Sequence, residues 1–173
     1  MRKTFRSKNN FEYWKKRWTD IDADEPMINH NSYPLKYSEM IVKNKNQLVL
    51  EAGCGAGRIL RYYHNKGFRI TGIEFIKEAI DKLKKIDNTL DARVGNILNL
   101  EFDNNYFDCI LAFGLYHNFY GEDLDKSLNE TYRVLKNGGN LCASFRADNI
   151  QERIVDWIRS EKTKEKKEFH KLN

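Results

Sequence analysis

Long hydrophobic stretches are missing from this sequence. None of its 173 residues belongs to a run of 18 apolar residues, so we expect no transmembrane helix. The basic start, MRKTFRSKNN, leads into the segment FEYW at 11–14 and not into an apolar stretch, which argues against a signal peptide. A cytoplasmic protein without membrane contact is therefore the default expectation.

Cysteine and proline are also scarce. The three cysteines, Cys54, Cys109 and Cys142, are too scattered for a zinc site and odd in number, so we expect reduced thiols and no metal. The two prolines, Pro26 and Pro34, both lie in an irregular, aromatic-rich stretch over the first 45 residues, where they act as breakers.

An excess of one charge is lacking as well. Charged residues make up 32% of the chain, but both signs are mixed and the net charge is only +5. Aromatic and basic residues are interleaved only at 13–18, so we do not expect a nucleic-acid partner. The 40% of apolar residues and the length suit one compact domain with a core.

From residue 47 short apolar runs alternate with amphipathic stretches. The expected strands are 47–51, 69–74, 91–94, 107–113 and 140–145. Helices are expected at 35–43, from the glycines at 53–57 to about Gly67, around 76–83, and at 124–135, where Asn137, Gly138 and Gly139 predict a cap and turn.

This alternation predicts an α/β fold, an open, doubly wound, mostly parallel sheet with helices on both faces. Ligands of such sheets bind beyond the carboxyl ends of the strands, beside the first strand. We expect an N-terminal lid segment at 1–45, a ligand-binding core at 46–147, and a helix followed by a charged tail at 148–173.

The segment LVLEAGCGAGR (48–58) carries the strongest signal. Its alternate glycines follow a buried strand and would let the backbone approach a ligand and turn into a helix. The spacing is G-x-G-x-G, and Arg58 stands where a dinucleotide fold has its last glycine. Glu51 would repel a pyrophosphate but suits a ligand with an ammonium group.

These residues resemble the first motif of class I S-adenosylmethionine-dependent methyltransferases, whose loop holds the methionine moiety of the cofactor. GIEF places Glu74 where the family has a ribose-binding acid, and VGNIL offers Asn96 and Ile97 to adenine. LAFGLYHNF and RVLKNGGNL match the fourth motif and the helix, turn and strand that follow. The resemblance implies the strand order 3-2-1-4-5 and a methyltransferase that uses S-adenosylmethionine.

The same resemblance assigns the cofactor a set of contacts around the carboxyl ends of the strands. The assigned residues are Glu51, Ala52, Gly53, Cys54, Gly55, Gly57, Glu74, Phe75, Asn96, Ile97, Phe113 and Gly114.

Candidates for the acceptor side follow the fourth and fifth strands. His117, flanked by Tyr116 and Asn118, could be a catalytic base or a hydrogen-bond donor to the substrate, or could merely pack under a lid. Arg146 would suit an anionic group of the substrate, or could pair with Asp148.

An aromatic cluster precedes the core. Tyr13, Trp14 and Trp18 could close over the cofactor as a lid, in a W-x3-W pattern distantly similar to thiopurine-type methyltransferases. The alternative is a hydrophobic stripe that docks on the core, because Trp14 and Trp18 lie one turn apart on a helix.

No strand is expected after Phe145, whereas the family usually ends with two more strands, as a β-hairpin. The chain could be a truncated copy, a variant capped by residues 148–160, or half of a homodimer that pairs its open sheet edges. We expect methyl transfer to a small-molecule acceptor. The alternatives are a non-catalytic cofactor-binding or interaction protein and, less favoured by the glycine spacing, an NAD-dependent oxidoreductase.

Overall fold

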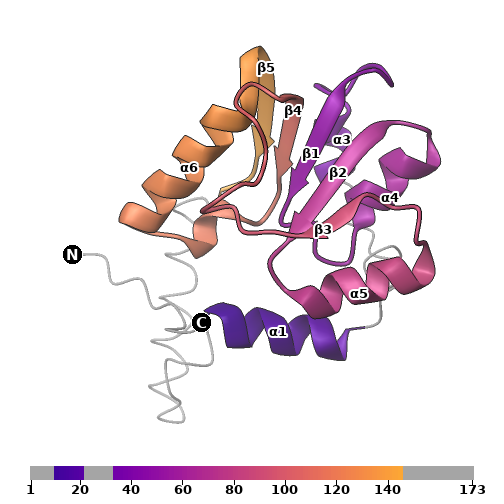
Figure 1. The fold of residues 1–173 in the computed structure, drawn as a ribbon, viewed down its shortest axis with the longest axis vertical. Coiled ribbons are helices and arrows are strands. Elements are labelled where there is room, and N and C mark those ends of the chain that lie inside the picture. The colour runs from indigo at the N-terminus through magenta and orange to yellow at the C-terminus, as the bar shows by residue number, and fades with distance from the viewer. Residues whose placement is uncertain (1–9, 22–32, 146–173) are drawn as a thin grey trace, which may run out of the picture.

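A computed structural model describes residues 10–21 and 33–145 of the chain (Figure 1). In chain order the elements are α1 (Asn10–Asp20), α3 (Tyr33–Ser38), β1 (Leu48–Ala52), α4 (Arg58–Asn65), β2 (Arg69–Glu74), α5 (Lys77–Ile86), β3 (Ala92–Val94), β4 (Phe107–Ala112), the short 3-10 helix η1 (Tyr116–Asn118), α6 (Glu122–Val134) and β5 (Leu135–Ala143). Within the described residues α1 and α3 precede the sheet, and helices then connect the strands except between β3 and β4.

The five strands form one sheet in the order β3-β2-β1-β4-β5, and every neighbouring pair is parallel. The predicted fold class and strand order are confirmed. In this order β1 lies at the centre, between β2 and β4, and the chain changes direction across the sheet after β3. The crevice beyond the carboxyl end of β1 is where such sheets bind ligands.

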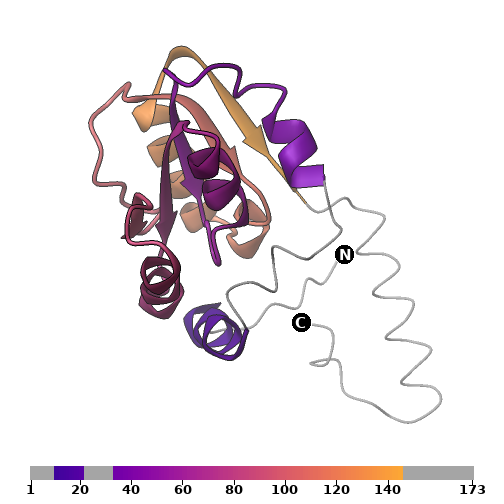
Figure 2. The ribbon, with the colours of Figure 1, turned by 90° about the vertical axis from the view of Figure 1, so that its right-hand side faces the viewer.

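Each face of the sheet carries its own hydrophobic core because successive strand side chains point to opposite faces. Val49 belongs to the core beneath α4 and α5, whereas its neighbour Leu50 belongs to the core beneath α6. Both side chains are fully buried. Helices lie on both faces of the sheet (Figure 2).

The helical periodicities predicted the buried faces of α4 and α5 correctly. Ile59, Leu60 and Tyr63 of α4 are buried. In α5 the buried residues are again those that recur with the helical period, Ala79, Ile80 and Leu83.

The bounds of β5 and of the helix expected at 35–43 differ most from the prediction. β5 begins at Leu135, five residues before the expected start at Asn140, and α6 ends at Val134. Leu135 pairs with Phe107, the ladder is then interrupted, and pairing resumes at Asn140. The expected turn therefore exists as an irregularity inside the strand, where Gly138 has φ 76°. The helix expected at 35–43 is Tyr33–Ser38, followed by a turn.

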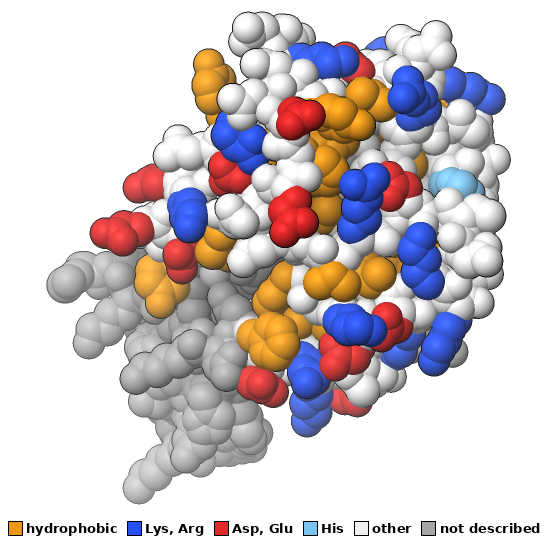
Figure 3. Space-filling model, in the orientation of Figure 1, with side chains coloured by type: hydrophobic (Ala, Val, Ile, Leu, Met, Phe, Trp, Pro, Cys, Tyr) orange, Lys and Arg blue, Asp and Glu red, His pale blue; other side chains and the backbone are white. Residues whose placement is uncertain are grey.

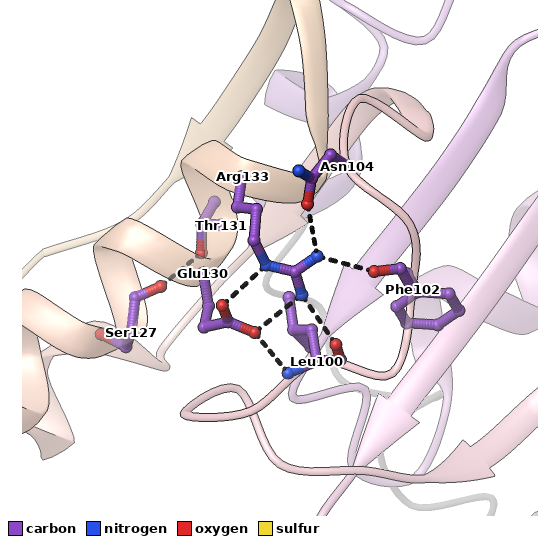
Figure 4. Close-up of polar contacts among 7 residues, drawn as sticks. All are labelled: Leu100, Phe102, Asn104, Ser127, Glu130, Thr131 and Arg133. Atoms are coloured by element: carbon purple, nitrogen blue, oxygen red, sulfur yellow. Dashed lines mark hydrogen bonds and ion pairs between the residues drawn. The ribbon is translucent and has the colours of Figure 1, made fainter.

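An arginine on α6 ties this helix to the long connection between β3 and β4 (Figure 4). Arg133 donates hydrogen bonds to the carbonyl oxygens of Leu100 and Phe102 and to Oδ1 of Asn104, at 2.8–2.9 Å. It also pairs with Glu130, whose Oε2 accepts the Leu100 N–H. The network fixes the connection that ends one side of the crevice.

Three expectations from the sequence concern the C-terminal segment, the cysteines and membrane-spanning helices. Arg146 and the helix and tail expected at 148–173 lie outside the described residues. All three cysteines are free. Among residues 10–21 and 33–145, no helix is both long and apolar enough to cross a membrane.

Candidate cofactor-binding site

A cavity of about 510 Å³ opens beyond the carboxyl ends of β1, β2 and β4. Its walls are formed by the glycine loop, the segments at the ends of β2 and β3, the segment after β4, and the helices α1 and α3. The lining residues are Trp14, Arg17, Trp18, Tyr33, Pro34, Glu51, Gly53, Cys54, Gly55, Ala56, Arg58, Ile59, Ile73, Glu74, Phe75, Gly95, Asn96, Ile97, Leu98, Phe113, Gly114, Leu115, Asn118 and Phe119.

The glycines of the loop after β1 hold conformations that other residues avoid. Gly55 and Gly57 have φ 52° and 73°. A Cβ on Gly55 would lie 2.4 Å from Cζ2 of Trp18, and one on Gly57 would lie 2.6 Å from Cδ2 of Leu83. The absence of a side chain at Gly55 thus leaves room for the Trp18 ring, and its absence at Gly57 leaves room for the Leu83 side chain of α5.

Glu51 is the next-to-last residue of β1, lies in the cavity wall and is only 5% exposed. Its Oε2 accepts the Leu60 N–H in the first turn of α4 at 2.8 Å. Burial raises the pKa of Glu51 to about 8, the nearby charge of Glu74 adds to this, and the hydrogen bond from Leu60 opposes it. The ionised form of such a buried carboxyl group becomes more favourable when a cation, for example an ammonium group, binds next to it.

Glu74 ends β2, next to β1, and is 6% exposed. Its two oxygens accept the N–H groups of Gly55 and Ile76, both at 3.1 Å. Burial raises the pKa of Glu74, and these backbone hydrogen bonds oppose the shift. The carboxylate therefore holds the glycine loop in place. It also lines the cavity, as expected of the residue that the resemblance assigned to the ribose.

The segment after β3 forms another wall. Oδ1 of Asn96 accepts the Leu98 N–H at 2.9 Å, which folds the turn that brings Ile97 against the core at 5% exposure. Phe75, 38% exposed, faces the same cavity from the end of β2. An aromatic ring, an aliphatic side chain and an amide are the groups that a purine base requires.

The helix α1 lies alongside α5, at the end of the sheet where the strands terminate (Figures 1 and 2). Lys82 of α5 donates to the carbonyl oxygens of Thr19 and Ile21 at 2.7 and 2.6 Å. Phe11 packs edge-on against Phe75, with 5.7 Å between the ring centroids. α1 is thus docked at the edge of the cavity.

Two tryptophans of α1 face the cavity. Trp14 and Trp18 stack with 6.0 Å between their ring centroids, and both line the cavity. Tyr13 packs against Trp14 but is 49% exposed and does not line it. The predicted lid therefore remains a prediction, now with Trp14 and Trp18 as its contact residues.

The wall after β4 is mostly apolar. Tyr33 packs edge-on against Phe113, with 6.0 Å between the ring centroids. Asn118 contributes the polar side chain here, and its amide nitrogen donates to the carbonyl oxygens of Gly114 and Leu115 at 2.9 and 2.8 Å. Gly114 in turn donates its N–H to Oγ of Ser144, at the end of β5.

Some residues assigned to the site from the sequence lie elsewhere. Ala52 is fully buried in the core under α6, and Gly57 faces α5. Tyr116 is 1% exposed, its hydroxyl is hydrogen-bonded to Thr131 at 2.7 Å, and it does not line the cavity, so its contact with the substrate stays a prediction. His117 does not line the cavity, although its ring lies 3.8 Å from where a Cβ of Gly114 would be.

Sequence reasoning also missed part of the lining. Ala56, Arg58 and Ile59 continue the glycine loop, and Gly95, Leu98, Leu115 and Phe119 adjoin assigned residues, so proximity along the chain could have found them. Arg17, Tyr33, Pro34 and Ile73 are also in the lining. Arg17 and Tyr33 reach the cavity only through the docking of α1 and α3, for which the sequence contains no local signal.

These residues fit an adenosyl amino-acid ligand. The loop provides room for a backbone-proximal group, and two buried carboxylates stand at the ends of neighbouring strands for groups that carry protons or positive charge. Fold and site together define a class: α/β proteins that bind a nucleoside-containing cofactor at the switch point of a parallel sheet.

The comparisons with known proteins narrow the class. A family profile described as a methyltransferase domain matches residues 50–143, more than half of the chain. An uncharacterised methyltransferase of Schizosaccharomyces pombe is 29% identical over 116 residues, 66% of this chain and 44% of the relative. A malonyl-acyl-carrier-protein O-methyltransferase of Erwinia billingiae is 28% identical over 116 residues, 66% of this chain and 45% of the relative.

A solved structure has the same fold. Phosphoethanolamine N-methyltransferase 1 of Haemonchus contortus, in complex with phosphoethanolamine and S-adenosylhomocysteine, gives a TM-score of 0.60 at 19% identity, covering 76% of this chain and 30% of that chain. The chain belongs to the methyltransferase-domain family. It spans about half the length of these curated relatives.

Proposed function

We propose that this protein transfers the methyl group of S-adenosylmethionine to a small-molecule acceptor. The observation that carries the proposal is the cavity itself, which is lined by the glycine loop, by the acids near the carboxyl ends of β1 and β2, and by the wall after β4. When bound, the cofactor would supply a methyl group on a sulfonium: a nucleophile of the acceptor attacks the methyl carbon in line, and S-adenosylhomocysteine leaves as the neutral thioether. The protein has to align the two reactants and exclude water.

The size of the cavity supports a small acceptor. Its volume of about 510 Å³ lies within the range of sites that hold one drug-sized ligand. The cofactor takes up much of that space, so only a small reacting group fits beside it. The Erwinia relative is named as an O-methyltransferase, which makes oxygen nucleophiles the first acceptors to test.

The distribution of charge gives no support to a nucleic-acid acceptor. On the face drawn in Figure 3, basic and acidic side chains are interspersed, and neither sign covers a broad area. A protein that binds phosphates along a duplex needs a basic stripe or patch. The low net charge of +5 agrees with this pattern.

The acceptor would lie against the wall after β4. This wall is lined by Phe113, Leu115 and Phe119 and by the amide of Asn118, so it offers a dry surface with one polar group. His117 remains a candidate base only if the bound state turns its ring into the cavity. Methylation by the His117→Ala variant should fall at least about 10-fold if the ring takes a proton, whereas a rate within about a factor of two assigns His117 a packing role.

The main competing function is a non-catalytic protein that binds the cofactor. Calorimetry with S-adenosylmethionine, S-adenosylhomocysteine and NAD, followed by a methyl-transfer assay with generic acceptors, separates the candidates. An enzyme binds the first two and methylates an acceptor. A non-catalytic protein binds them without turnover, and an oxidoreductase binds NAD.

We also propose pairing of two chains through β5. In the described residues β5 forms the end of the sheet, and its Leu141 is 41% exposed. An exposed sheet edge is normally covered by another element or another chain. Sedimentation of the full chain as a dimer would support the pairing, and a monomer at all concentrations would reject it.

A further inference from the structure

The wall of the cavity after β4 differs in charge from the rest of the lining. Among the described lining residues, the charged ones belong to β1, β2, α1 and α4 and are Glu51, Glu74, Arg17 and Arg58. The described lining contributed by α3 and by the segment 113–119 contains no Asp, Glu, His, Lys or Arg. We expect the part of a ligand that lies against this wall to be uncharged, because a buried charge needs a partner.

Aromatic rings form much of this wall. Tyr33 of α3 packs edge-on against Phe113, with 6.0 Å between the ring centroids and 76° between the ring planes. Phe119 enters the lining from the other end of the segment, where the amide nitrogen of Asn118 donates back to the carbonyl oxygen of Gly114 at 2.9 Å. Both ends of the segment therefore reach one wall. Rings of this kind favour a flat aromatic ligand, which can pack edge-on or offset against them.

Hydrogen bonds to the rest of the fold hold this wall in place. The Gly114 N–H donates to Oγ of Ser144 at 2.8 Å. Oγ1 of Thr131 donates its only hydrogen to the carbonyl oxygen of Ser127 at 2.8 Å (Figure 4), so the Tyr116 hydroxyl is the donor in its 2.7 Å hydrogen bond with Thr131. This buried chain ties η1 to α6. A wall held in this way loses little freedom when a ligand packs against it, which favours binding of a ligand of matching shape.

The same wall touches the glycine loop. Cδ1 of Leu115 lies 3.1 Å from the position that a Cβ of Gly53 would take. Gly53 is the first glycine of the loop that the resemblance assigned to the methionine moiety of the cofactor. A ring that lies against this wall would therefore be next to the part of the cavity assigned to the cofactor.

The described lining of this wall also lacks a general base. His117 belongs to the segment 113–119 but does not line the cavity. An acceptor here must therefore have a nucleophile that loses its proton to water. An aromatic hydroxyl does so far more readily than an aliphatic one, as the pKa of about 10 for the tyrosine phenol illustrates. An aliphatic amine is protonated at neutral pH, so it too would need a base.

We propose that the methyl acceptor is a one-ring aromatic compound with a hydroxyl group on the ring, which packs against Tyr33, Phe113 and Phe119. The inference rests on the proposed methyl transfer and names the acceptor class. The ring hydroxyl gives its proton to water, its oxygen forms a bond to the methyl carbon, and the bond from that carbon to the sulfur of the cofactor breaks. The products are the aryl methyl ether and S-adenosylhomocysteine.

Binding of two probes to the full chain saturated with S-adenosylhomocysteine tests the aromatic part of the proposal. Phenol and cyclohexanol have rings of similar size, but only phenol is aromatic. Titrations followed by ligand NMR should give phenol an affinity at least about 10-fold higher than that of cyclohexanol.

Variants of the wall locate the binding of phenol. Tyr33→Leu and Phe119→Leu should each weaken phenol binding about 3- to 10-fold, and should leave the affinities for cyclohexanol and S-adenosylhomocysteine within about 2-fold. Unchanged affinity for S-adenosylhomocysteine shows that each variant is folded. Tyr132→Leu on α6, where the tyrosine is 79% exposed and outside the cavity lining, is the matched control and should change none of the three affinities.

Methylation of 4-nitrophenol in the presence of S-adenosylmethionine tests the nucleophile, because methylation removes the yellow colour of the phenolate. The rate should rise with pH until the hydroxyl of the probe is fully ionised, and it should fall at least about 3-fold in Tyr33→Leu. Benzyl alcohol has the aromatic ring but an aliphatic hydroxyl, so it should bind without being methylated. Ethanolamine should not be methylated.

The outcomes separate this inference from the proposed function. Equal binding of phenol and cyclohexanol, or faster methylation of benzyl alcohol or ethanolamine than of 4-nitrophenol, would overturn the aromatic hydroxyl as the acceptor and leave methyl transfer as the function. Binding of S-adenosylhomocysteine without methylation of 4-nitrophenol would also reject this acceptor class. Absence of S-adenosylhomocysteine binding to the unmutated protein would instead reject the proposed function.

Discussion

The buried carboxylate of Glu51 makes stability depend on pH in a direction opposite to that of a salt-bridged acid. Its pKa is about 8 in the folded chain, against an ordinary value of 4.5 for a glutamate in water. The folded state therefore holds one proton more than the unfolded state between these values. The stabilising effect is fully present below pH 4.5 and is lost as the pH rises through about 8.

The size of the effect follows from the shift. One pKa unit corresponds to about 1.4 kcal/mol, so ionisation of Glu51 in the unfolded chain alone lowers the free energy of unfolding by about 3 kcal/mol between pH 4.5 and 7. Glu74, whose pKa is also raised, adds to the loss with the same sign. The two buried acids therefore lower the free energy of unfolding of the ligand-free protein at neutral pH, and in their ionised form they favour the binding of a cationic group of the cofactor.

Urea unfolding of Glu51→Gln between pH 5 and 8 tests this reasoning. Glutamine cannot ionise and its carbonyl oxygen can still accept the Leu60 N–H. The variant should therefore be more stable than the unmutated protein at pH 7, by up to about 3 kcal/mol, with a flatter dependence on pH. Glu101→Gln, an exposed acid, is the control. Equal pH slopes for Glu51→Gln and the unmutated protein would refute the buried, protonated state of Glu51.

Three further changes have defined outcomes. Gly57→Ala places a Cβ 2.6 Å from Leu83 at positive φ and should lower the free energy of unfolding by about 1–3 kcal/mol more than Gly138→Ala, where φ is also positive but nothing lies within 4 Å; urea unfolding measures both. Arg133→Met removes the hydrogen bonds to the β3–β4 connection and should lower the free energy of unfolding by about 2 kcal/mol, measured by urea unfolding. Its control, Lys126→Met on the exposed face of α6, should lower it by less than about 0.5 kcal/mol. Lys82→Met removes the bonds to the end of α1 and should speed amide hydrogen exchange in residues 10–21 about 10-fold while leaving β1 unchanged; equal exchange in α1 would show that its docking does not depend on Lys82.

The parts of the fold that were predictable have a strong local periodicity. The buried faces of α4 and α5 follow the helical period, and β1 and β4 are apolar runs that belong at the centre of a parallel sheet. The start of β5 was not predictable in this way. Gly138 and Gly139 have the composition of a turn, but pairing of Leu135 with Phe107 continues the sheet on the other side of that turn.

The site was predictable where its residues are close in sequence. Glu51, Gly53 and Gly55 form one loop, and Glu74 ends the next strand. Arg17 could not be assigned from the sequence, since a charged residue on a short helix has the appearance of solvent-exposed surface. Tyr116 shows the reverse case: a tyrosine close in sequence to the site has its hydroxyl hydrogen-bonded to Thr131 inside the core.

The central claim is that the cavity above the glycine loop binds S-adenosylmethionine. Titration calorimetry of the full chain with S-adenosylhomocysteine and with NAD, repeated with Gly55→Val, tests it most directly. A side chain at position 55 would collide with Trp18, 2.4 Å from the position of its Cβ. We predict one-to-one binding of S-adenosylhomocysteine, no binding of NAD, and a loss of affinity of at least about 10-fold in the variant. Equal affinity of Gly55→Val and the unmutated protein for S-adenosylhomocysteine, or preferential binding of NAD, would contradict this account.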